Sequence, residues 1–586
     1  MRDDRGARFE VDVADEDPHA LLETPVAGTV SVAVPDNVYV TGSTPTEPRW
    51  TEVNTRFSMR PTVFERPSDE DTNTQTSRQH MVLTAATVPV KGERTKDYRG
   101  RIRVWPGLLL LLAIVAVASA GIVLGAHKSY KQSNERALNV QTKLAQKRAI
   151  QDGLSSGDVD VADDGLVNNP RTYPPKKCSL PNYVSKNGQI IAISPNGTQV
   201  AVGIKGVNWF GMETKNAVPF GLWQNDQNGT TVFDIASFLQ RHKFNSVRLP
   251  ISLWHVLENT PPKEGLVNLQ TNRAMNLKNY MTTLQSIIQA LAYRKITVLL
   301  SFHTFAPDDN ESGLWYDRNV PETSVLKAID ILTTNLCKDD YWNVIGIDLK
   351  NEPHKATWGD GVAATDWSIG AATLGNQMLK GCPNWVGFVE GIYGGKNTGT
   401  IDGQEYAYFN WWGGGLQGAA TKGVSFTTAN KVVYAPHYYT TAVSPQDYFY
   451  GGKTWKDMIE LPDDRLRTRV SDSMGIMFGF LAGKNEAIVL GEFGGLYAKD
   501  KHPQKTTKRT TDFTIEVIVR DKYAGGYMWS MNPESAYQYN PITAGTYTEG
   551  LLADDWLTPN TEFLSGMDAL NSLPNIKDFP CFYDKA

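Results

Sequence analysis

The chain is poor in cysteine, has no CxxC pair and carries no excess of positive charge. Four cysteines in 586 residues exclude a small scaffold built on disulfides, and without CxxC spacing there is no zinc ribbon. Lysine and arginine total 58 against 63 aspartates and glutamates, so the net charge of −5 excludes the broad basic face that nucleic-acid binding requires. The 50 glycines and 31 prolines are too few for a fibrous or wholly disordered protein. Hydrophobic residues, at 41%, suffice for a sizeable core.

One long apolar run interrupts this composition. Residues 104–126 contain no charged side chain, and a helix of that length crosses the roughly 30 Å core of a bilayer. A buried core helix is one alternative, but no apolar partner segment lies nearby. A cleaved signal peptide is another, because Ala118-Ser119-Ala120 resembles a cleavage site, yet the 103 residues before the run far exceed a signal peptide's n-region. We therefore predict a transmembrane signal-anchor helix.

Flanking charges predict how this helix is oriented. Six lysines and arginines lie within 15 residues before the run, and three lie within 15 residues after it. By the positive-inside rule the N-terminus is cytosolic, and the large C-terminal part lies outside the cell or in the secretory lumen, as in a single-pass type II membrane protein. All four cysteines and all three Asn-x-Ser/Thr sequons follow the run, which agrees with that topology. The predicted glycosylation sites are Asn196, Asn228 and Asn310.

Three further segments are predicted around the anchor. Residues 1–103 are rich in Thr, Pro, Ser, Asp, Glu and Arg, with few aromatic residues, so they cannot bury enough apolar surface to fold and are predicted to be a disordered cytosolic tail. Residues 127–175 form a polar stalk and a linker that ends in Pro174-Pro175. Residues 176–586 form the folded domain.

The folded domain alternates apolar strand patterns with helix patterns. It opens with a hairpin at 188–205 around an Asn196-Gly197 turn. The predicted strands are Val202–Asn208, Ser246–Pro250, Thr297–His303, Val344–Lys350, Trp385–Glu390, Val432–His437, Ala487–Glu492 and Gly526–Ser530. The predicted helices are Val232–His242, Leu277–Tyr293, Glu322–Leu336, Asp366–Leu379, Asp464–Leu481, Thr510–Tyr523 and Thr561–Leu570. Continuously apolar strands have both faces buried, so the pattern predicts an α/β fold of the (β/α)8 TIM-barrel type. A doubly wound open sheet is the alternative, but the first strand is not followed by a glycine-rich dinucleotide turn.

Polar side chains gather where the predicted strands end, which is where a barrel of this type carries its chemistry. Glu352 and Glu492 each follow an apolar strand, so both should point into the barrel mouth. Glycoside hydrolysis uses two carboxyl groups, one on each side of the glycosidic bond. One protonates the leaving oxygen, and the other attacks the anomeric carbon or activates water. A salt bridge or cap is the alternative for either glutamate taken alone.

Other strand-end residues fit this chemistry. Arg248 and the Tyr439 hydroxyl would keep a nucleophilic carboxylate ionised. Asn351 offers an amide to a sugar 2-hydroxyl, and His303 and His437 could hold hydroxyls or orient the carboxylates. The tryptophans expected to stack on sugar rings, each equally compatible with a core position, are Trp209, Trp315, Trp411, Trp412 and Trp529. No metal or organic cofactor motif is present, so none is expected.

Ordered motifs over nearly 400 residues resemble the glycoside hydrolase family 5 cellulases, of the endo-β-1,4-glucanase type. They are Gly206-Val207-Asn208-Trp209-Phe210-Gly211, Val247-Arg248-Leu249-Pro250, Asp348-Leu349-Lys350-Asn351-Glu352-Pro353-His354, Trp411-Trp412-Gly413-Gly414, Tyr434-Ala435-Pro436-His437-Tyr438-Tyr439, Gly491-Glu492-Phe493-Gly494-Gly495 and Trp529-Ser530-Met531-Asn532-Pro533. The resemblance implies a retaining mechanism with Glu352 as acid/base and Glu492 as nucleophile. It places Arg248, His303, Asn351, His437, Tyr439 and Trp529 at the family's other active-site positions. Two departures, Gly415 and the segment 535–547, bear on substrate preference.

The four cysteines allow three pairings, and free thiols are a further alternative. We favour Cys337 with Cys382, at the ends of consecutive barrel helices. Cys178 with Cys581 would then join the two ends of the domain.

The leading hypothesis is a membrane-tethered, retaining endo-acting hydrolase whose partners are a cellulose-like or mixed-linkage β-glucan and, through one helix, the lipid bilayer. The same mechanism on β-mannan, β-1,3-glucan or a glycolipid is an alternative. A non-catalytic cell-surface glycan receptor is the alternative from another class, although binding alone has no need for two glutamates.

Overall fold

The computed structural model describes residues 104–151, 169–174, 176–307 and 313–583. The predicted disordered tail, the middle of the predicted stalk and Asn310 lie outside these residues. The chain divides into two units whose boundary, between residues 137 and 138, falls within the first described helix.

The first helix, α2 (Val104–Gln151), contains the predicted anchor and continues without a break into the predicted stalk. Its segment Leu109–Lys131 is 23 residues long with a hydropathy of 2.7, apolar and long enough to cross a membrane. None of the most apolar stretch of this segment is buried, and leucines such as Leu109 and Leu124 are more than 60% exposed. By length and composition, this segment could cross a membrane.

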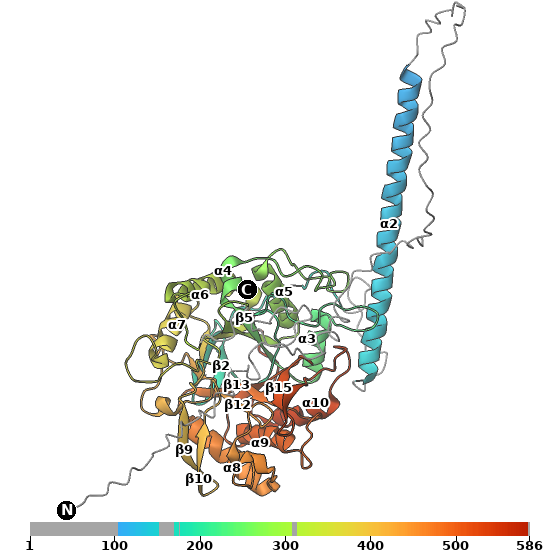
Figure 1. Ribbon diagram of the computed structural model, residues 1–586. Helices are drawn as coiled ribbons and strands as arrows, with labels where there is room; N and C mark the ends of the chain where they lie inside the picture. Colours follow the sequence, from blue (N-terminus) through green and yellow to red (C-terminus); the bar gives the residue numbers. More distant parts are fainter. Residues whose placement is uncertain (1–103, 152–168, 175, 308–312, 584–586) are drawn as a thin grey trace, which may run out of the picture. The chain divides into compact units, whose positions relative to one another are not determined.

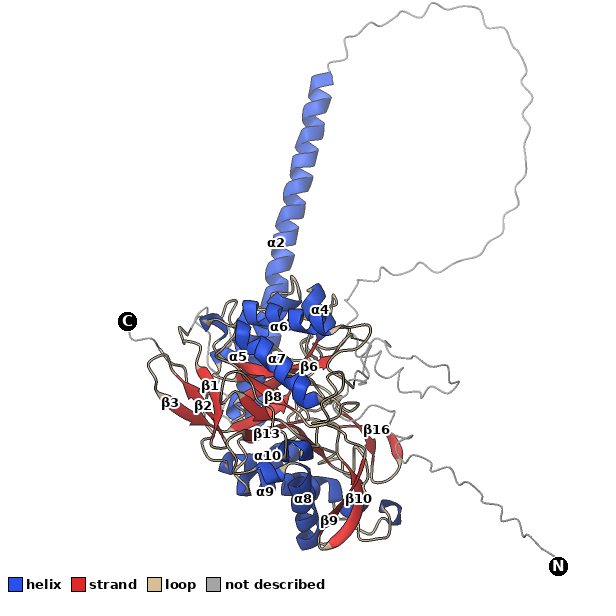
Figure 2. Cartoon of the chain, turned by 90° about the vertical axis from the view of Figure 1, so that its left-hand side faces the viewer, coloured by secondary structure: helices blue, strands red, loops and turns tan. Residues whose placement is uncertain are grey.

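Eight parallel strand positions close into a barrel among the described residues, which confirms the predicted (β/α)8 fold (Figures 1 and 2). The first barrel strand pairs with the last, and this pairing closes the sheet without an edge. The barrel strands are β4 (Ile204–Asn208), β5 (Ser246–Ser252), β6 (Thr297–Thr304), β7 (Val344–Asp348), β8 (Val386–Val389), β11 (Val432–Tyr434) with β12 (His437–Tyr439), β13 (Ala487–Gly494) and β14 (Gly525–Met528).

The sixth barrel position differs from the single strand Val432–His437 that the sequence predicts. It is split into β11 and β12 around Ala435-Pro436, because proline has no N–H to donate to a ladder. The Pro436 carbonyl still accepts the N–H of Gly491, at 3.0 Å. β12 then pairs with β13 so that His437 lies opposite Glu492. The break therefore carries two predicted site residues, His437 and Tyr439, to the upper end of the barrel.

Helices surround the barrel, and Figure 2 shows α5, α6 and α7 on one side of the strands and α8, α9 and α10 on the other. Local signals start several of them: Thr231 caps α3, and Asn279 with Thr282 forms a capping box at α5. The helices are α3 (Val232–Arg241), α4 (Leu253–Glu258), α5 (Tyr280–Tyr293), α6 (Glu322–Leu336), α7 (Trp367–Gly381), α8 (Asp463–Met477), α9 (Thr506–Arg520) and α10 (Thr561–Met567). Among these, α4 is an element that the sequence did not predict.

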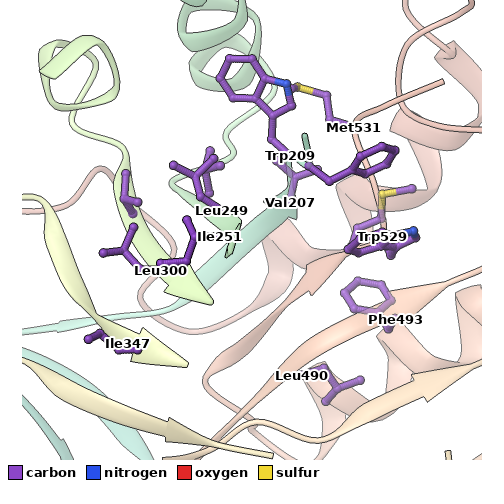
Figure 3. Packing of buried hydrophobic residues seen from close by; sticks show 14 of the residues in the cluster. Val207, Trp209, Leu249, Ile251, Leu300, Ile347, Leu490, Phe493, Trp529 and Met531 are labelled. Carbon is purple, nitrogen blue, oxygen red and sulfur yellow. The ribbon is translucent and has the colours of Figure 1, made fainter. Parts of the chain in front are cut away.

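Buried apolar residues form two clusters. The larger one joins the helices to the outward side of the strands and extends to the ends of β4 and β14, to which Trp209, Trp529 and Met531 belong (Figure 3). The smaller one fills the lower barrel with residues such as Leu299, Ile345 and Val489. It continues into a three-stranded antiparallel sheet of β1 (Asn182–Lys186), β2 (Gln189–Ile193) and β3 (Gln199–Val202).

This small sheet caps the N-terminal ends of the barrel strands. The N–H of Tyr183 donates to the Asn384 carbonyl just before β8, and that of Ser185 donates to Asn430 just before β11, both at 2.8 Å. Two of its strands form the predicted hairpin, and β1 is an addition to it. Two more hairpins, β9 (Lys396–Ile401) with β10 (Gln404–Phe409) and β15 (Ala536–Tyr539) with β16 (Ala544–Thr548), follow β8 and β14. The second occupies the segment that departs from the family pattern.

All four cysteines are paired as the sequence favoured. Cys337 at the end of α6 bonds Cys382 at the end of α7. Cys178 bonds Cys581 across a sequence separation of 403 residues and so ties the two ends of the domain together. Of the predicted glycosylation sites, Asn196 is exposed at the tip of the β2–β3 turn, whereas Asn228 is half-buried and its amide oxygen accepts the Trp223 indole N–H at 3.2 Å.

Candidate active site

Most of the predicted site residues meet at the C-terminal ends of the barrel strands, around the guanidinium of Arg248. This arginine lies on β5 and is fully buried. Its Nη1 donates to Glu492 Oε1 at 2.5 Å and to Asn208 Oδ1 at 2.9 Å. Its Nη2 donates to Asn351 Oδ1 at 2.8 Å. Because one cation binds groups from several strands, Arg248 fixes their relative positions.

Both carboxyl oxygens of Glu492 accept hydrogen bonds. Oε1 accepts a hydrogen bond from the Arg248 guanidinium, and Oε2 accepts one from the Tyr439 hydroxyl. Burial together with the charge of Glu492 raises the pKa of Tyr439 far above its usual value, so this hydroxyl keeps its proton. Leu490 pairs with Gly526 and Phe493 with Met528, so β13 has one extra residue at Gly491-Glu492. Such a bulge redirects a side chain, here into the barrel mouth.

Glu352 has the opposite environment. Its Oε1 lies 3.1 Å from His437 Nδ1, and its buried Oε2 has no hydrogen-bond partner among the described residues. Burial raises the pKa of Glu352 above its usual range; the contact with His437 opposes the rise and the charge of Glu492 adds to it. The backbone of Glu352 has φ of 49°, in the left-handed region that side chains other than glycine rarely adopt. Its N–H donates to Glu390 Oε2 at 2.7 Å.

The two predicted catalytic carboxylates lie close together. Glu352, His437 and Glu492 each place one ligand atom within 4.8 Å of the others. A retaining glycosidase holds its two carboxyl groups about 5 to 5.5 Å apart, and an inverting one holds them about 6.5 to 9.5 Å apart. Such a trio has the composition of a metal site, but both Glu492 oxygens are already bound by a cation and a phenol. The geometry therefore suits a pair of hydrolytic carboxylates better than a metal centre.

The remaining predicted polar residue, His303, lies at a second irregular strand end. Ile251 pairs with Phe302 and Ser252 with Thr304, so His303 is an extra residue in β6. Its ring is nearly parallel to that of Trp529, with centroids 5.8 Å apart. Trp529 follows β14 and is also stacked against Phe210. His303 and Trp529 thus belong to one aromatic group at the barrel mouth, and their contact with a sugar stays a prediction.

The other four tryptophans divide into buried and accessible positions. Trp209, Trp315 and Trp411 are at most 2% exposed. The Trp209 indole N–H donates to the Phe220 carbonyl and that of Trp315 to Glu322. These three rings pack in the core of the described residues, as Trp529 also does at 1% exposure, so burial does not separate them from Trp529 and their contact with a sugar stays a prediction. Trp412 is half-buried and stacks on His354 with centroids 3.8 Å apart, and it remains the accessible candidate for stacking.

Two buried carboxyl groups that contact Arg248, those of Asp348 and Glu390, were not predicted as site residues from the sequence. Asp348 Oδ2 accepts Arg248 Nε at 2.9 Å, and Glu390 Oε1 accepts Nη2 at 3.1 Å. Burial raises the pKa of each to about 7, against the opposing charge of Arg248. The available signal was position: Glu390 ends a predicted strand just as Glu352 and Glu492 do.

A closed parallel barrel whose mouth holds a carboxyl group bound by a cation and a desolvated carboxyl group, a few ångströms apart, is the arrangement typical of a glycoside hydrolase. The sequence profile of the family described as cellulase, glycosyl hydrolase family 5, matches residues 196–535. The chain belongs to this family.

Similar proteins come from several bacteria and an archaeon. An endoglucanase of Paenibacillus polymyxa is 30% identical over 387 residues, which cover 65% of this chain and 85% of that protein. The major extracellular endoglucanase of Xanthomonas campestris is 32% identical over 61% of this chain and 65% of its own length. A structure of the endocellulase from Pyrococcus horikoshii in complex with cellotetraose is 28% identical with a TM-score of 0.56, covering 67% of this chain and 99% of that one.

Proposed function

We propose that this chain is a retaining endo-β-1,4-glucanase tethered to a membrane, with Glu492 as nucleophile and Glu352 as acid/base. The observation that carries the proposal is the contrast between two neighbouring carboxyl groups. Glu492 is held by a cation and a hydroxyl, which stabilise its charge. Glu352 is desolvated and keeps one oxygen free. Environments that separate the pKa values of two neighbouring carboxyl groups assign the acid and the base.

In the first step, a Glu492 oxygen attacks the anomeric carbon of a β-glycosidic bond. The bond to the leaving oxygen breaks as Glu352 donates its proton to that oxygen, and the unpartnered Oε2 is the atom placed to do so. Arg248 and Tyr439 position the nucleophile. The products of this step are a sugar leaving group and an α-linked glycosyl-enzyme ester.

In the second step, Glu352 is a carboxylate and acts as base. It removes a proton from a water molecule, whose oxygen attacks the anomeric carbon and releases Glu492 as a carboxylate. Two inversions restore the β configuration, and Glu352 is again protonated. Formation of the ester neutralises Glu492, so the charge that raised the pKa of Glu352 disappears when Glu352 must act as base.

The proposed substrate is a β-1,4-linked glucan. Support comes from relatives named endoglucanase and from the endocellulase structure in complex with cellotetraose. The Trp412 ring, backed by His354, offers a platform of the kind that stacks on pyranose rings. Cleavage of β-mannan, β-1,3-glucan or a glycolipid in its place would reassign the substrate, and glycan binding without turnover would favour a receptor.

The membrane tether is proposed from the segment Leu109–Lys131, with the barrel on the non-cytosolic side. The excess of cations before the helix and the two disulfides of the barrel support this orientation. The protein should remain in the membrane pellet after carbonate extraction, and protease added to sealed vesicles should spare the barrel. Recovery of the protein in the soluble fraction would contradict the tether.

The mechanism is tested by the stereochemistry and the rescue of variants. NMR of a cello-oligosaccharide digest should show the β anomer first. With an aryl β-cellobioside that has a good leaving group, azide should rescue Glu492→Ala as an α-glycosyl azide and Glu352→Ala as a β-glycosyl azide, because the two variants are blocked at different steps. Initial release of the α anomer by the wild type would contradict a retaining mechanism.

A further inference from the structure

We propose that Glu390 is a positioning residue for the acid/base Glu352, an inference that rests on the proposed function. Glu390 directly follows β8, is fully buried, and lies in the group of residues bound to Arg248. It does not have to touch the sugar for this role, because it acts on the backbone of Glu352 and, through His437, on its side chain.

The first link is a backbone contact. Glu390 Oε2 accepts the N–H of Glu352 at 2.7 Å, a charge-assisted hydrogen bond to the residue whose φ of 49° is unfavourable for a side chain with a Cβ. A conformation of this kind persists only where surrounding contacts hold it. Glu390 supplies one such contact at the residue that must carry the proton.

The second link runs through the His437 imidazole. Nδ1 lies 3.1 Å from Glu352 Oε1, while Nε2 lies 3.0 Å from Glu390 Oε1, within ion-pair distance although off the line of a hydrogen bond. The ring therefore stands between the two carboxyl groups. Charge on Glu390 acts on the ring that contacts Glu352.

Two glycines hold this arrangement in place. A Cβ on Gly413, which has φ of +74°, would meet Glu390 Oε2 at 2.5 Å and His437 Cγ at 3.0 Å. A Cβ on Gly491 would meet His437 Nε2 at 2.9 Å. The loop after Trp411-Trp412 and the bulge of β13 thus pack directly against the ring and leave it little room to turn away from Glu390.

Titratable and charged groups from several elements face Glu390. They are Arg248 from β5, Asp348 from β7, Glu352 after β7, His437 from β12 and Glu492 from β13. The cation Arg248 is shared with Glu492 and Asp348, so it does not neutralise Glu390 alone. Removing the charge of Glu390 should therefore make Glu352 easier to ionise.

The test compares Glu390→Gln and Glu390→Asp with wild type on two substrates, carboxymethyl-cellulose and 2,4-dinitrophenyl β-cellobioside. The dinitrophenolate leaving group of the second substrate departs without protonation by an acid. Glu390→Gln should lose about 10- to 100-fold in kcat on the polysaccharide, with KM nearly unchanged. The basic limb of its kcat/KM profile should move to lower pH. The rate of glycosylation by the activated substrate should fall much less. Glu390→Asp retains the carboxylate, but its shorter side chain moves the carboxylate away from the Glu352 N–H. This variant should therefore lose activity while the basic limb of its kcat/KM pH profile stays at the wild-type pH.

Glu549→Gln is the matched control, because Glu549 is 1% exposed and its carboxylate accepts the backbone N–H groups of Tyr497, Ala498 and Lys499 rather than any group around Glu352. It should lower Tm without moving the pH limb. An unshifted limb in Glu390→Gln, or equal losses on both substrates in both variants, overturns the inference. Absence of turnover by the wild type on either substrate defeats the proposed function instead, so the two failures are distinguishable.

Discussion

The two ends of the barrel differ in the side chains that they bury, which are mainly apolar at the lower end and charged at the upper end. At the lower end, the interior is apolar and continues into the β1–β3 cap, and the backbone groups of the cap are bonded to the starts of the strands. At the upper end, one arginine holds three buried carboxyl groups, Asp348, Glu390 and Glu492. The first arrangement lowers the free energy of the fold. The second places like charges together out of water, which costs stability and is tolerated where chemistry needs it.

The two ends also differ in the groups that surround a buried cationic side chain. Lys431, at the lower end, donates to the Tyr183 carbonyl at 2.6 Å and to Asn182 Oδ1 at 2.7 Å, which are both neutral acceptors. Burial lowers the pKa of Lys431 to about 7. Arg248 at the upper end faces carboxylates and keeps its charge. Substitutions at the two ends should therefore separate activity from stability.

The largest effect is expected from Glu492→Gln. If Glu492 is the nucleophile, as proposed, its loss should reduce kcat on β-glucan by about 10⁴-fold or more. Tm should change little or rise, because one of the three carboxylates around Arg248 becomes neutral. Rate assays with thermal unfolding of the same preparation check both parts. A variant that keeps a tenth of the wild-type rate would remove Glu492 from the mechanism.

Glu352→Gln should show a smaller and substrate-dependent loss. Without the acid, hydrolysis of the polysaccharide should slow by about 10²- to 10⁴-fold, whereas glycosylation by an aryl cellobioside with a good leaving group should be nearly unaffected. Because burial raises the pKa of Glu352 and the acid must be protonated, the fall of wild-type activity with rising pH should begin above the usual titration range of a glutamate. Equal losses on the two substrates would show that Glu352 is not the acid.

At the lower end, the double variant Cys178→Ser/Cys581→Ser should do the reverse. Removing the link between the domain ends should cost about 2 to 5 kcal/mol of stability, while kcat measured well below the new Tm stays within twofold of wild type. Denaturant unfolding followed by assay checks this. A fall in kcat with no loss of stability would mean that the two ends are coupled rather than separate.

The smallest effect is expected from Lys431→Gln, which retains a donor but removes the charge. In wild type the folded pKa of about 7 lies below the unfolded value near 10.5. Burying the charged form therefore costs most below pH 7, and the cost vanishes as pH rises towards 10. Relative to wild type, the Tm of the variant should improve as pH is lowered from 9 to 6. A Tm difference that is constant over this range would contradict the assigned cause.

Strand positions, helix positions and the gathering of polar side chains at the strand ends followed from the sequence because apolar runs and strand-end side chains are local signals. The split at Ala435-Pro436 was readable in principle, since Pro436 cannot donate to a ladder. The burial of Trp209, Trp315 and Trp411 was not, because an indole ring suits a core as well as a sugar site. Glu390 ends a predicted strand, which was a usable signal. Its contacts with Arg248, His437 and the Glu352 backbone, which lie 38 to 142 residues away in sequence, could not be predicted from a local pattern.

The pairing of β4 with β14 sets an order on biosynthesis. Until residues 525–528 leave the ribosome, β4 presents an unsatisfied edge and the lower interior has no closing wall. The partner of Cys178 emerges later still, 403 residues after it. For most of the 403 residues of synthesis between Cys178 and Cys581, the nascent chain carries an unpaired Cys178 thiol beside a sheet that has not closed, and exposed strand edges of this kind favour aggregation. Truncation anywhere before Met528 should yield aggregates rather than a smaller enzyme.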